Sequence, residues 1–598
     1  MAILPVVKVT QYGTADQKDA VLDGLQELGI MHLVDLNRSH DEDTHQLKLF
    51  PNAFHALKFL RTSPTHRRAT KDDSSFQFDK VVEKALWIEE QQQQFQAEHD
   101  ELKIAIEQLT PWGNFQLPAD GDLSGLRLWF YIIPHYRVSL LEQIAITWHV
   151  VARDHRFVYI VVLSSDEPIG MPVSRVHLND RPLSELRRRF EDVKTELEEL
   201  HWQRVKLTRW THLLSRTIGI AKDRAARQRA AEQALDDPTM FAIQGWIPSS
   251  QSDQIRSFAQ QHELGLTIES PSTEELPPTL LANRGLTAGG EDAMSFYTTP
   301  AYRTWDPSSV VFWSFSVFFA MIMSDAGYAV LLVILSLLFW GRLGESSSGV
   351  RLRKLFVAIA ITSVAYGIAV GSYFGFPPPK GSVLDRLHVV DAANMTLMMQ
   401  ISISIGVAHL TLANLALSWS RRWSPMMLSS IGWASILAGG LAFGLGKSGI
   451  GQTDTLIYYG TWTIGAGIVG IFFFSSDRPI FTLSLKDHGK RFVDGILSLT
   501  SISRIFGDVL SYLRLFALGL ASAQLAATFN ELTYKASCCF GVGSLLAVVA
   551  VVFGHGLNFA LVIMSGVVHG LRLNCIEFFG WSLPDEGYPF QPFCKKAK

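Results

Sequence analysis

The stretch GDVLSYLRLFALGLASAQLA, residues 507–526, and the stretch MSGVVHGLRLNCIEFFG, residues 564–580, each place one arginine inside an apolar run. A membrane-spanning helix needs about 20 apolar residues, at a rise of about 1.5 Å per residue. Both stretches belong to longer apolar segments, at about 493–530 and 541–580, which can cross a membrane with tilt. The sequence therefore predicts two long, tilted helices at the C-terminal end of a membrane protein.

Other apolar runs precede these two segments. They lie at 355–373, 396–417, 426–445 and 456–474. The run from Val310 to Trp340 is too long for one upright span, and Ser324-Asp325-Ala326-Gly327 interrupts it, so we predict two short helices that turn at this tetrapeptide. The predicted membrane domain, residues 306–598, is all-α with about eight helices, or seven if the first pair is one tilted helix.

Composition sets this half apart from the first half of the chain. The 598 residues are 48% hydrophobic and 18% charged, with a mean hydropathy of +0.16. This balance is too apolar for an ordinary soluble enzyme and too charged for a protein wholly within lipid. The net charge of −3 does not indicate nucleic-acid binding, and the four cysteines lack the spacing of a metal site. The N-terminus lacks a secretion signal. We therefore predict a multi-domain membrane protein with a cytoplasmic domain at residues 1–305.

Loop charges predict the orientation, because Lys and Arg are enriched in cytoplasmic loops. With the N-terminus inside, the inner loops hold Arg342, Arg351, Arg353, Lys354, Arg421, Arg422, Arg478, Lys486, Lys490 and Arg491. The outer loops hold Lys380, Arg386, Lys447 and Lys535. We therefore expect a multi-pass protein of the cell (inner) membrane, with the N-terminal domain and the C-terminus in the cytoplasm.

The cytoplasmic domain is predicted to contain small α/β lobes. Strand, helix and strand patterns lie at 6–10, 15–28 and 31–36, which together predict a β-α-β unit, and again at 240–247, 250–262 and 264–269. Further strands are predicted at 126–133 and 157–163. We interpret these lobes as packing modules and expect no catalytic site in them.

Two long polar helices with heptad spacing lie between the lobes. One seam consists of Ala85, Ile88, Phe95, Leu102, Ile106 and Leu109, interrupted by Gln92 and His99, and the other of Leu183, Leu186, Phe190, Val193, Leu197 and Leu200. We interpret the regions 79–110 and 182–235 as the arms of a long antiparallel coiled-coil hairpin that joins the lobes and resists force. The alternative is two separate surface helices.

Each arginine inside a span needs an explanation, because a central arginine costs at least about 2.5 kcal/mol on insertion. On a continuous helix, the face around Arg514 holds Gly507, Leu510, Leu518, Ala521, Leu525 and Thr528, with Ser511 and Ala517 at its margins. Small residues allow another helix to approach closely in a membrane, so this arginine could meet a partner. The alternative is an arginine that snorkels toward the interface.

The last helix carries a polar stripe beside its own arginine. Gly554, Asn558, Ser565 and His569 project near Arg572 and could wet a path from one side of the membrane. The alternative is hydrogen bonding between helices, without any transport role. Other polar residues of these two helices could line access routes or pair with neighbours; they are Asp508, Gln524, Asn530, His555 and Glu577.

A nucleotide-binding loop is not expected. GLGKSG at residues 444–449 is similar to part of a phosphate loop, but Leu441 stands where the first glycine is required, and the segment ends a predicted span. If ATP drives this protein, another subunit hydrolyses it.

Several sequence blocks resemble one family. SYLRLFALGLASAQLA at 511–526 and HGLNFALVIMSGVVHGLRLNCIEFFGWSLPDEGYPFQPF at 555–593 look like the last two helices of the V-type (V/A-type) ATPase a subunit, called subunit I in prokaryotes. GWIP at 245–248, PPTLLAN at 277–283, and PAYRTWDPSS leading to FAMIMSDAGYAV are similar to the family's linker and first hairpin. The chain is short for the eukaryotic form, which favours a prokaryotic one. Gly519, Ser522 and Asn574-Cys575 depart from the common pattern, but both arginines are present.

The resemblance implies a static membrane subunit of a rotary ATPase or ATP synthase, with no catalytic site, cofactor or metal of its own. In this family a proteolipid rotor ring (c/K-type subunits) carries buried carboxylates past two offset half-channels. Motif position makes Arg514 the essential arginine and Arg572 its companion. The candidate half-channel residues are Ser511, Gln524, Asn558, Ser565, His569 and Glu577. The implied partners are the ring, the peripheral stalk subunits (E/G type), the central stalk and catalytic A/B head, and the lipid bilayer.

Two other functions fit some of these features. A secondary ion-coupled transporter with a cytoplasmic regulatory domain could also contain intramembrane charges and broken helices, although we find no repeated halves. A membrane-anchored scaffold could use the arginines only in structural pairs. Whether the ion is a proton or sodium depends mainly on the ring, which is another polypeptide.

Overall fold

The computed structural model describes residues 3–37, 51–68, 75–116, 125–143, 146–178, 181–283, 285–391, 394–449, 453–476, 478, 485–537 and 542–596. The chain divides into two compact units. The first consists of residues 1–18, 30–36 and 234–593, and the second of residues 19–29, 37–233 and 594–598. The units are described separately.

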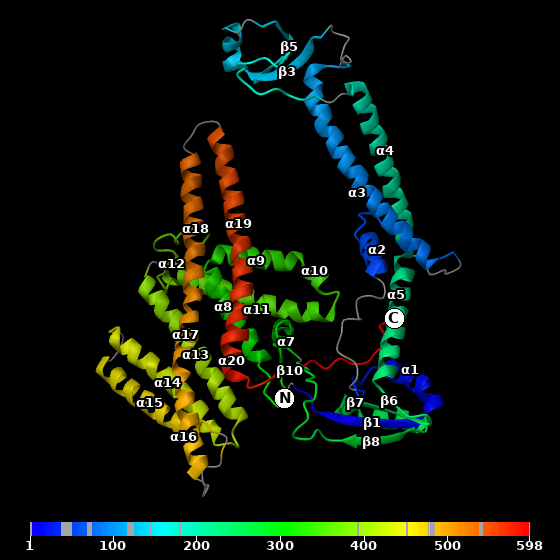
Figure 1. The fold of residues 1–598 in the computed structure, drawn as a ribbon. Helices are drawn as coiled ribbons and strands as arrows, with labels where there is room; N and C mark the ends of the chain where they lie inside the picture. Colours follow the sequence, from blue (N-terminus) through cyan, green and yellow to red (C-terminus); the bar gives the residue numbers. More distant parts are fainter. Residues whose placement is uncertain are drawn as a thin grey trace. The chain divides into compact units, whose positions relative to one another are not determined.

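The first unit contains a sheet in which distant parts of the chain alternate (Figure 1). Its strands are β1 (Val6–Thr14), β2 (His32–Val34), β6 (Leu235–Asp236), β7 (Met240–Pro248) and β8 (Gly265–Glu269), with η6 (Ser249–Gln251) and α6 (Ser252–Gln261) between the last two. The order is β2-β7-β1-β8, and β7 lies antiparallel to both β1 and β2. The predicted strands β1 and β2 therefore form, but they do not pair with each other, because β7 from much later in the chain lies between them.

The apolar helices of the first unit follow the predicted runs closely. They are α8 (Ser308–Met323), α9 (Ala326–Leu338), α11 (Ser347–Val370), α13 (Met395–Ser420), α14 (Met426–Lys447), α15 (Thr453–Phe474), α16 (Leu485–Thr500), α17 (Ile502–Ser511), α18 (Leu513–Ser537) and α19 (Val542–Arg572). Short elements join them: α7 (Ala288–Ser295), β9 (Thr299–Pro300), α10 (Trp340–Leu343), α12 (Val383–Arg386), η7 (Leu573–Phe578), α20 (Phe579–Ser582) and β10 (Glu586–Gly587).

Six helical segments in the described part of the chain are long and apolar enough to cross a membrane. The last two are the longest, at 51 residues for Asp487–Ser537 and 40 residues for Gly543–Ser582. The predicted pair of short helices is confirmed as α8 and α9, which meet at the tetrapeptide. The total of eight spans stays a prediction, because α8 and α9 are each shorter than a span.

The segment that carries Arg514 is not one regular helix, which corrects our expectation. It is divided at Ser501 and at Tyr512 into α16, α17 and α18. At the second break the chain tightens, since the Tyr512 amide donates to the Val509 carbonyl at 3.1 Å and the Leu515 amide to the Tyr512 carbonyl at 3.0 Å. A projection at one constant angle fails across such a break. Gly507 and Leu510 therefore belong to a different helix from Arg514.

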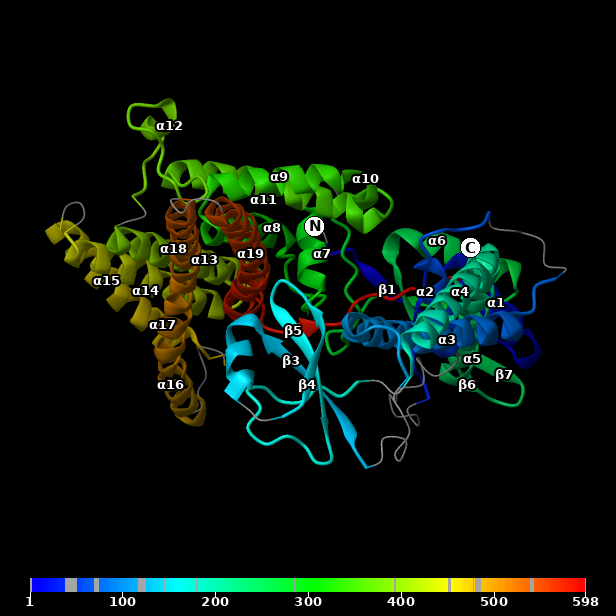
Figure 2. The ribbon, with the colours of Figure 1, turned by 90° about the horizontal axis from the view of Figure 1, so that it is seen from above.

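Glycines bring α14 and α15 into close contact, and these helices lie side by side in both views (Figure 1; Figure 2). Gly432 and Gly439 of α14 face Gly467 and Gly460 of α15. A Cβ atom added at Gly467 would lie 2.6 Å from the Gly432 carbonyl oxygen, closer than real Cβ contacts. This small-residue interface is typical of helix packing in membranes.

The second unit has a helical part and a small sheet. Its helices are α1 (Lys18–Leu28), α2 (Pro51–Arg61), α3 (Phe78–Leu109), α4 (Leu183–Leu207) and α5 (Thr211–Gln233). It also has the 3-10 segments η3 (Thr110–Trp112), η4 (His135–Gln143) and η5 (Thr208–Trp210), and η1 (Ala15–Gln17) precedes α1. The sheet has the order β3-β5-β4. These strands are β3 (Arg127–Pro134), β4 (Trp148–Arg153) and β5 (Phe157–Ser164), of which β4 was not predicted.

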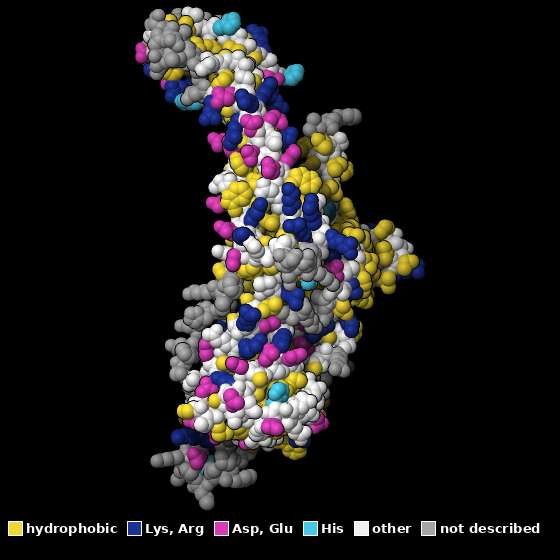
Figure 3. Space-filling view, turned by 90° about the vertical axis from the view of Figure 1, so that its right-hand side faces the viewer, with side chains coloured by type: hydrophobic (Ala, Val, Ile, Leu, Met, Phe, Trp, Pro, Cys, Tyr) yellow, Lys and Arg dark blue, Asp and Glu magenta, His cyan; other side chains and the backbone are white. Residues whose placement is uncertain are grey.

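Helices α3 and α4 pack along most of the predicted seam. Leu102, Leu109, Leu183, Leu186 and Val193 are buried together, with Phe95, Ile106, Phe190 and Leu197 packed against them. Arg189 donates to both oxygens of Glu98, at 2.7 and 2.9 Å, and Lys/Arg and Asp/Glu side chains are interspersed over this region (Figure 3). The predicted arm at 182–235 is interrupted by η5, where Trp210 is buried. The coiled-coil hairpin stays a prediction.

We expect Gly467→Leu to force α14 and α15 apart, because the added side chain would overlap the backbone of Gly432. Overpacking of this kind lowers stability by about 1–3 kcal/mol. Thermal unfolding of the purified chain in detergent measures the effect. Gly465→Leu is the matched control on the same helix, because nothing lies within 4 Å of its added Cβ. Equal unfolding temperatures for the two variants would contradict this packing.

Candidate functional site

Arg514 lies in the first turn of α18, directly after the break at Tyr512. Its guanidinium Nη2 donates to the Ser511 hydroxyl oxygen at 3.3 Å. Tyr512 lies between Ser511 and Arg514 in the sequence. It is fully buried, and its side chain packs with Phe318 and Leu515. The Tyr512 hydroxyl also lies 2.8 Å from His409 Nδ1. The break thus directs Tyr512 into the core while Ser511 and Arg514 remain within reach of each other.

Ser511 connects Arg514 to the last helix. Its hydroxyl donates to Glu577 Oε1 at 2.5 Å, and the same oxygen lies 3.8 Å from Arg572 Nε. The Glu577 side chain is only 3% exposed. Four residues chosen from the sequence therefore meet in one network, which we call the arginine cluster: Arg514, Ser511, Glu577 and Arg572.

A helical irregularity places Glu577 in this cluster. Glu577 lies in η7, a π-helical segment that continues α19 after Arg572. Wider turns of this type are frequent at functional sites. On the neighbouring turn, the amide of Asn574 donates to the Gly570 carbonyl at 2.9 Å, and its oxygen accepts a hydrogen bond from Ser314 of α8. Asn574 and Glu577 interrupt the apolar pattern here, but neither residue type is specific for a π-helical turn, so sequence analysis did not predict this change of pitch.

The arginine cluster has excess positive charge and unused hydrogen-bonding atoms. It holds the guanidinium groups of Arg514 and Arg572 against the single carboxylate of Glu577. Among the described residues, Arg514 Nη1, Glu577 Oε2 and His569 Nδ1 are buried and have no hydrogen-bond partner. His569 is also close enough to interact electrostatically with both arginines. Such a site favours an additional anionic group, because a nearby cation stabilises the ionised form of a carboxylate.

Two of the predicted lining residues lie apart from this cluster. Gln524 is exposed on α18, and Ser565 is half-buried on α19. In the described part of the chain, no hydrogen bond joins either side chain to the arginine cluster. Gln524 instead lies on an exposed stripe of α18 whose other members are the small residues Ala517, Ala521 and Thr528.

Asn558 belongs to a second polar group, farther along the same helices. Its amide donates to the Tyr328 hydroxyl at 3.0 Å and to the Ser522 carbonyl at 3.0 Å. The Tyr328 hydroxyl lies 2.7 Å from His555 Nδ1, and His555 Nε2 lies 3.0 Å from the Asn530 amide oxygen. We call these residues the tyrosine cluster: Tyr328, Asn530, His555 and Asn558. Helices α18 and α19 lie side by side here, since an added Cβ at Gly554 would meet the Phe529 ring.

Sequence analysis did not assign Tyr328 or Asp325 to a site. Asp325 is buried and caps α9 by accepting from the Tyr328 amide at 3.0 Å. It also accepts from the Ser372 hydroxyl at 2.6 Å and from the amides of Phe374 and Gly375 at 2.9 Å each. The loop after α11 is thereby held at the start of α9. An acidic residue that interrupts an apolar run was the available signal, but its partners are distant in sequence.

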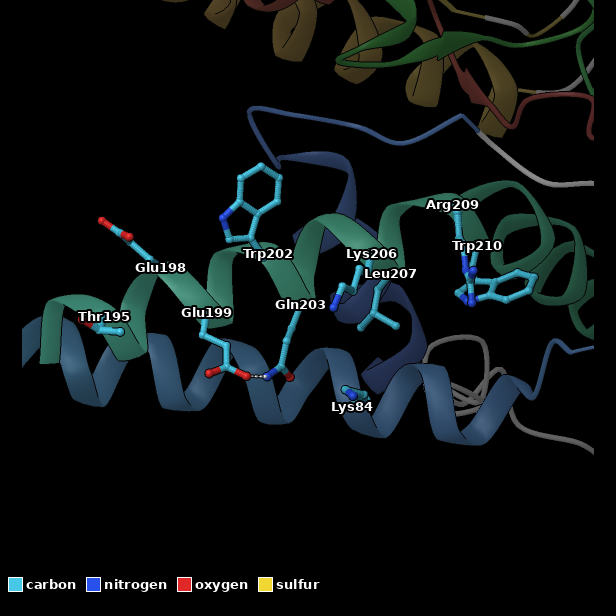
Figure 4. A pocket seen from close by; sticks show the side chains of 10 residues that line it. All are labelled: Lys84, Thr195, Glu198, Glu199, Trp202, Gln203, Lys206, Leu207, Arg209 and Trp210. Carbon is cyan, nitrogen blue, oxygen red and sulfur yellow. Dashed lines mark hydrogen bonds between the residues drawn. The ribbon is translucent and has the colours of Figure 1, made fainter. Parts of the chain in front are cut away.

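The second unit has a hollow beside α3 and α4 (Figure 4). Its volume is about 610 Å³, and Lys84 of α3 lines it together with residues of α4 and η5. The side chains of Glu199 and Gln203 join within it at 3.3 Å, whereas Trp202 points away from α3.

We expect Tyr328→Phe to destabilise the chain by about 1–3 kcal/mol, because Asn558 and His555 would each lose a buried hydrogen-bond partner. Chemical unfolding in detergent, followed by circular dichroism, measures the change. Tyr373→Phe is the matched control, since its hydroxyl is buried without a partner among the described residues. An equal effect of the two substitutions would show that the hydroxyl of Tyr328 adds nothing.

Comparisons with known proteins give a consistent result. Residues 499–595 match the model of the V-type ATPase 116kDa subunit family. This segment includes the whole arginine cluster and the residues of the tyrosine cluster on α18 and α19. A V-type ATP synthase subunit I of Chlamydia pneumoniae is 25% identical, over 88% of this chain and 87% of that protein. V-type ATP synthase subunit I 1 of Treponema pallidum is 26% identical, over 96% of this chain and 97% of that protein. An A-type ATP synthase subunit I of Methanocaldococcus jannaschii is 25% identical, over 64% of this chain and 59% of that protein.

Proposed function

Because this chain belongs to the V-type ATPase subunit I family, we propose that it is the static membrane subunit of a rotary ATPase or ATP synthase, where it guides ions past a turning proteolipid ring. It is a multi-pass membrane subunit of the ATPase complex. The arginine cluster is the observation that carries the proposal. An arginine placed beside a rotor must attract an ionised carboxylate, and the geometry of Arg514 supports this role.

Arg514 keeps donor capacity that a partner can use. Its contact with Glu577 passes through the Ser511 hydroxyl, and its Nη1 atom has no hydrogen bond within the described residues. A guanidinium beside a carboxylate lowers the carboxylate pKa by about 1–3 units. A ring carboxylate that arrives protonated would therefore release its ion at Arg514. The permanent charge would also block a direct leak between the two half-channels.

The exposed stripe of α18 suits contact with the rotor. Ala517, Ala521, Gln524 and Thr528 recur at helical spacing on the C-terminal side of Arg514, and all are exposed in the chain. Small side chains allow helices to approach closely within a membrane. A ring helix on this stripe would bring its carboxylate near Arg514 without a steric obstacle.

The two polar clusters support two offset half-channels. Arg514 and Asn530 are separated by 16 positions of α18, which corresponds to about 24 Å at 1.5 Å per residue. The arginine cluster, with His569, would serve one side of the membrane, and the tyrosine cluster, with Asn558, would serve the other. Ser565 lies on α19 between these levels. An ion would pass between the clusters only on the ring.

The remaining parts suit a stator. The N-terminal lobes and the paired helices α3 and α4 would bind peripheral stalk subunits and resist torque, with both termini in the cytoplasm. The central stalk and catalytic head would supply ATP chemistry, so this chain would be a non-catalytic subunit. The predicted division at residues 305 and 306 remains part of this proposal.

We expect Arg514→Ala to abolish ATP-driven ion movement in the assembled complex while ATP hydrolysis persists. Loss of the guanidinium would shift the balance between ionised and protonated ring carboxylate by about 10- to 1,000-fold. Arg514→Lys should also fail to couple, because a lysine lacks the planar fork of five donors. Ion uptake into proteoliposomes, measured together with ATP hydrolysis, gives the coupling ratio.

Lys535→Gln is the matched control for Arg514. It removes a cation from the same helix, and its ion pair with Glu531 is exposed, so it contributes about 0–1 kcal/mol. Coupling should therefore be unchanged. Retained ion pumping by Arg514→Ala would eliminate the proposed role. Unaided substrate uptake by the isolated chain in liposomes would favour the transporter instead.

We expect Glu577→Gln to reduce the coupling ratio by about tenfold and leave assembly intact. The amide keeps the shape of the side chain, but it leaves the two guanidinium groups without their carboxylate. Asp508→Asn is the control, because Asp508 is also partly buried but binds Trp581 Nε1 at 2.7 Å, outside the arginine cluster. If both variants couple normally, Glu577 has only a structural role.

A further inference from the structure

The end of α13 and the short loop that follows it combine two exposed tryptophans with two arginines. Trp419 is 71% exposed and Trp423 is 90% exposed. The guanidinium carbon of Arg422 lies 5.5 Å from the Trp419 ring centroid and 5.9 Å from the Trp423 ring centroid. Arg421 precedes it and is half-buried. Two large indole rings in this position would be costly in water, so the loop needs a covering environment.

The positive charge of this loop has no acidic counterpart. No aspartate or glutamate occurs between Asp391 and Asp454, a stretch that includes both helices and the loop. In the part of the chain that the structure describes, neither Arg421 nor Arg422 forms an ion pair. Arg478 differs in this respect, because it pairs with Asp487 at 3.7 Å, and Arg491 donates a hydrogen bond to the Phe473 carbonyl at 2.5 Å.

The packing of α14 against α15 sets the depth of the loop. Ser429, in the first turn of α14, lies 3.0 Å from Ser475, just past the end of α15. At the opposite end of the pair, Tyr458, Tyr459 and Trp462 are exposed. Gly446 of α14 faces Thr453 and Ile457 of α15, and Gly439 faces Gly460 and Thr463, so these aromatic residues lie level with about residues 439–446 of α14. The distance along α14 from its start to this level is about 20–30 Å, comparable with the roughly 30 Å thickness of a hydrocarbon core. Exposed Trp and Tyr side chains at such levels mark the two membrane interfaces.

The geometry points to a binding site for the phosphate of an anionic phospholipid, formed by Arg421 and Arg422 and flanked by Trp419 and Trp423. Guanidinium groups bind phosphate through parallel hydrogen bonds, and Trp rings prefer the headgroup region. The occupant is a lipid because the loop contains only residues 421–425 between two helices of membrane-spanning length. A loop of this length stays close to the headgroup region, where phospholipid phosphates lie.

The site has a consequence for the complex that is separate from ion guidance. A bound anionic lipid would anchor the α13–α14 hairpin, and α13 packs on the core that contains Tyr512 through His409. The anchor would thus fix the lipid-facing side of the helices that support Arg514. It requires no contact with the rotor and belongs to this chain alone.

Native mass spectrometry of the full chain, reconstituted in nanodiscs of phosphatidylcholine with a minority of phosphatidylglycerol, tests the site. We expect the wild-type chain to retain phosphatidylglycerol preferentially, and R421Q/R422Q to lose this preference by about 10- to 30-fold. R421K/R422K should keep most of the preference, because the charge remains. Lys447→Gln, at the opposite end of α14, should behave as wild type.

Equal retention of both lipids by the wild-type chain would overturn the inference, as would an unchanged preference in R421Q/R422Q. If R421Q/R422Q does not fold, the R421K/R422K variant decides: loss of the preference in this folded variant would overturn the inference, and retention would support it. The measurement needs no ATPase partner. Its outcome is therefore independent of the coupling result for Arg514.

Discussion

A permanent positive charge inside an apolar helix is the constraint on which the rest of the membrane unit depends. Arg514 cannot lose its proton, so the protein must compensate it by position. It does so through the Ser511 hydroxyl, which joins the guanidinium to the buried carboxylate of Glu577. An indirect link of this kind leaves the guanidinium only partly neutralised. A direct bidentate pair would compensate the charge better, but it would leave less attraction for a carboxylate from outside.

The surrounding helices keep this indirect arrangement in place. Tyr512 is buried next to the arginine, and its hydroxyl reaches His409 of α13. The Trp581 indole binds Asp508 of α17, while Asn574 and Ser314 join η7 to α8. Two of these contacts tie an arginine-bearing segment to α13 or α8, and the Trp581–Asp508 bond ties the two arginine-bearing segments to each other. Because these bonds lie in a region of low dielectric, loss of one partner leaves a buried polar group unpaired. The cluster therefore has few alternative arrangements.

The sequence was sufficient for features that depend on local composition. The long spans follow from runs of apolar residues, and the turn between α8 and α9 follows from Asp325 within such a run. It was insufficient where distant parts of the chain decide the outcome. Strand β7 lies between β1 and β2 in the sheet, and no feature of residues 6–36 predicts this insertion. The residues around Tyr512 and Glu577 are not specific for a helix break or a π-helical turn, so a constant helical projection placed Gly507 and Leu510 on the same helix as Arg514.

The C-terminal segment adds a mechanical connection to this picture. After α20, β10 pairs with β9, and the Phe590 amide and Tyr588 carbonyl bind Thr279 at 3.0 and 2.9 Å. Gln591 then donates its amide to His32 Nδ1 at 2.9 Å. The helix that carries Arg572 and Glu577 is thus tied, within a short stretch of extended chain, to the sheet near the N-terminus. These bonds use mostly backbone atoms and lie along the strands, so a force on α19 would load several of them together. Under the proposed stator role, this connection would let the sheet and the helices around Arg514 bear load as one unit.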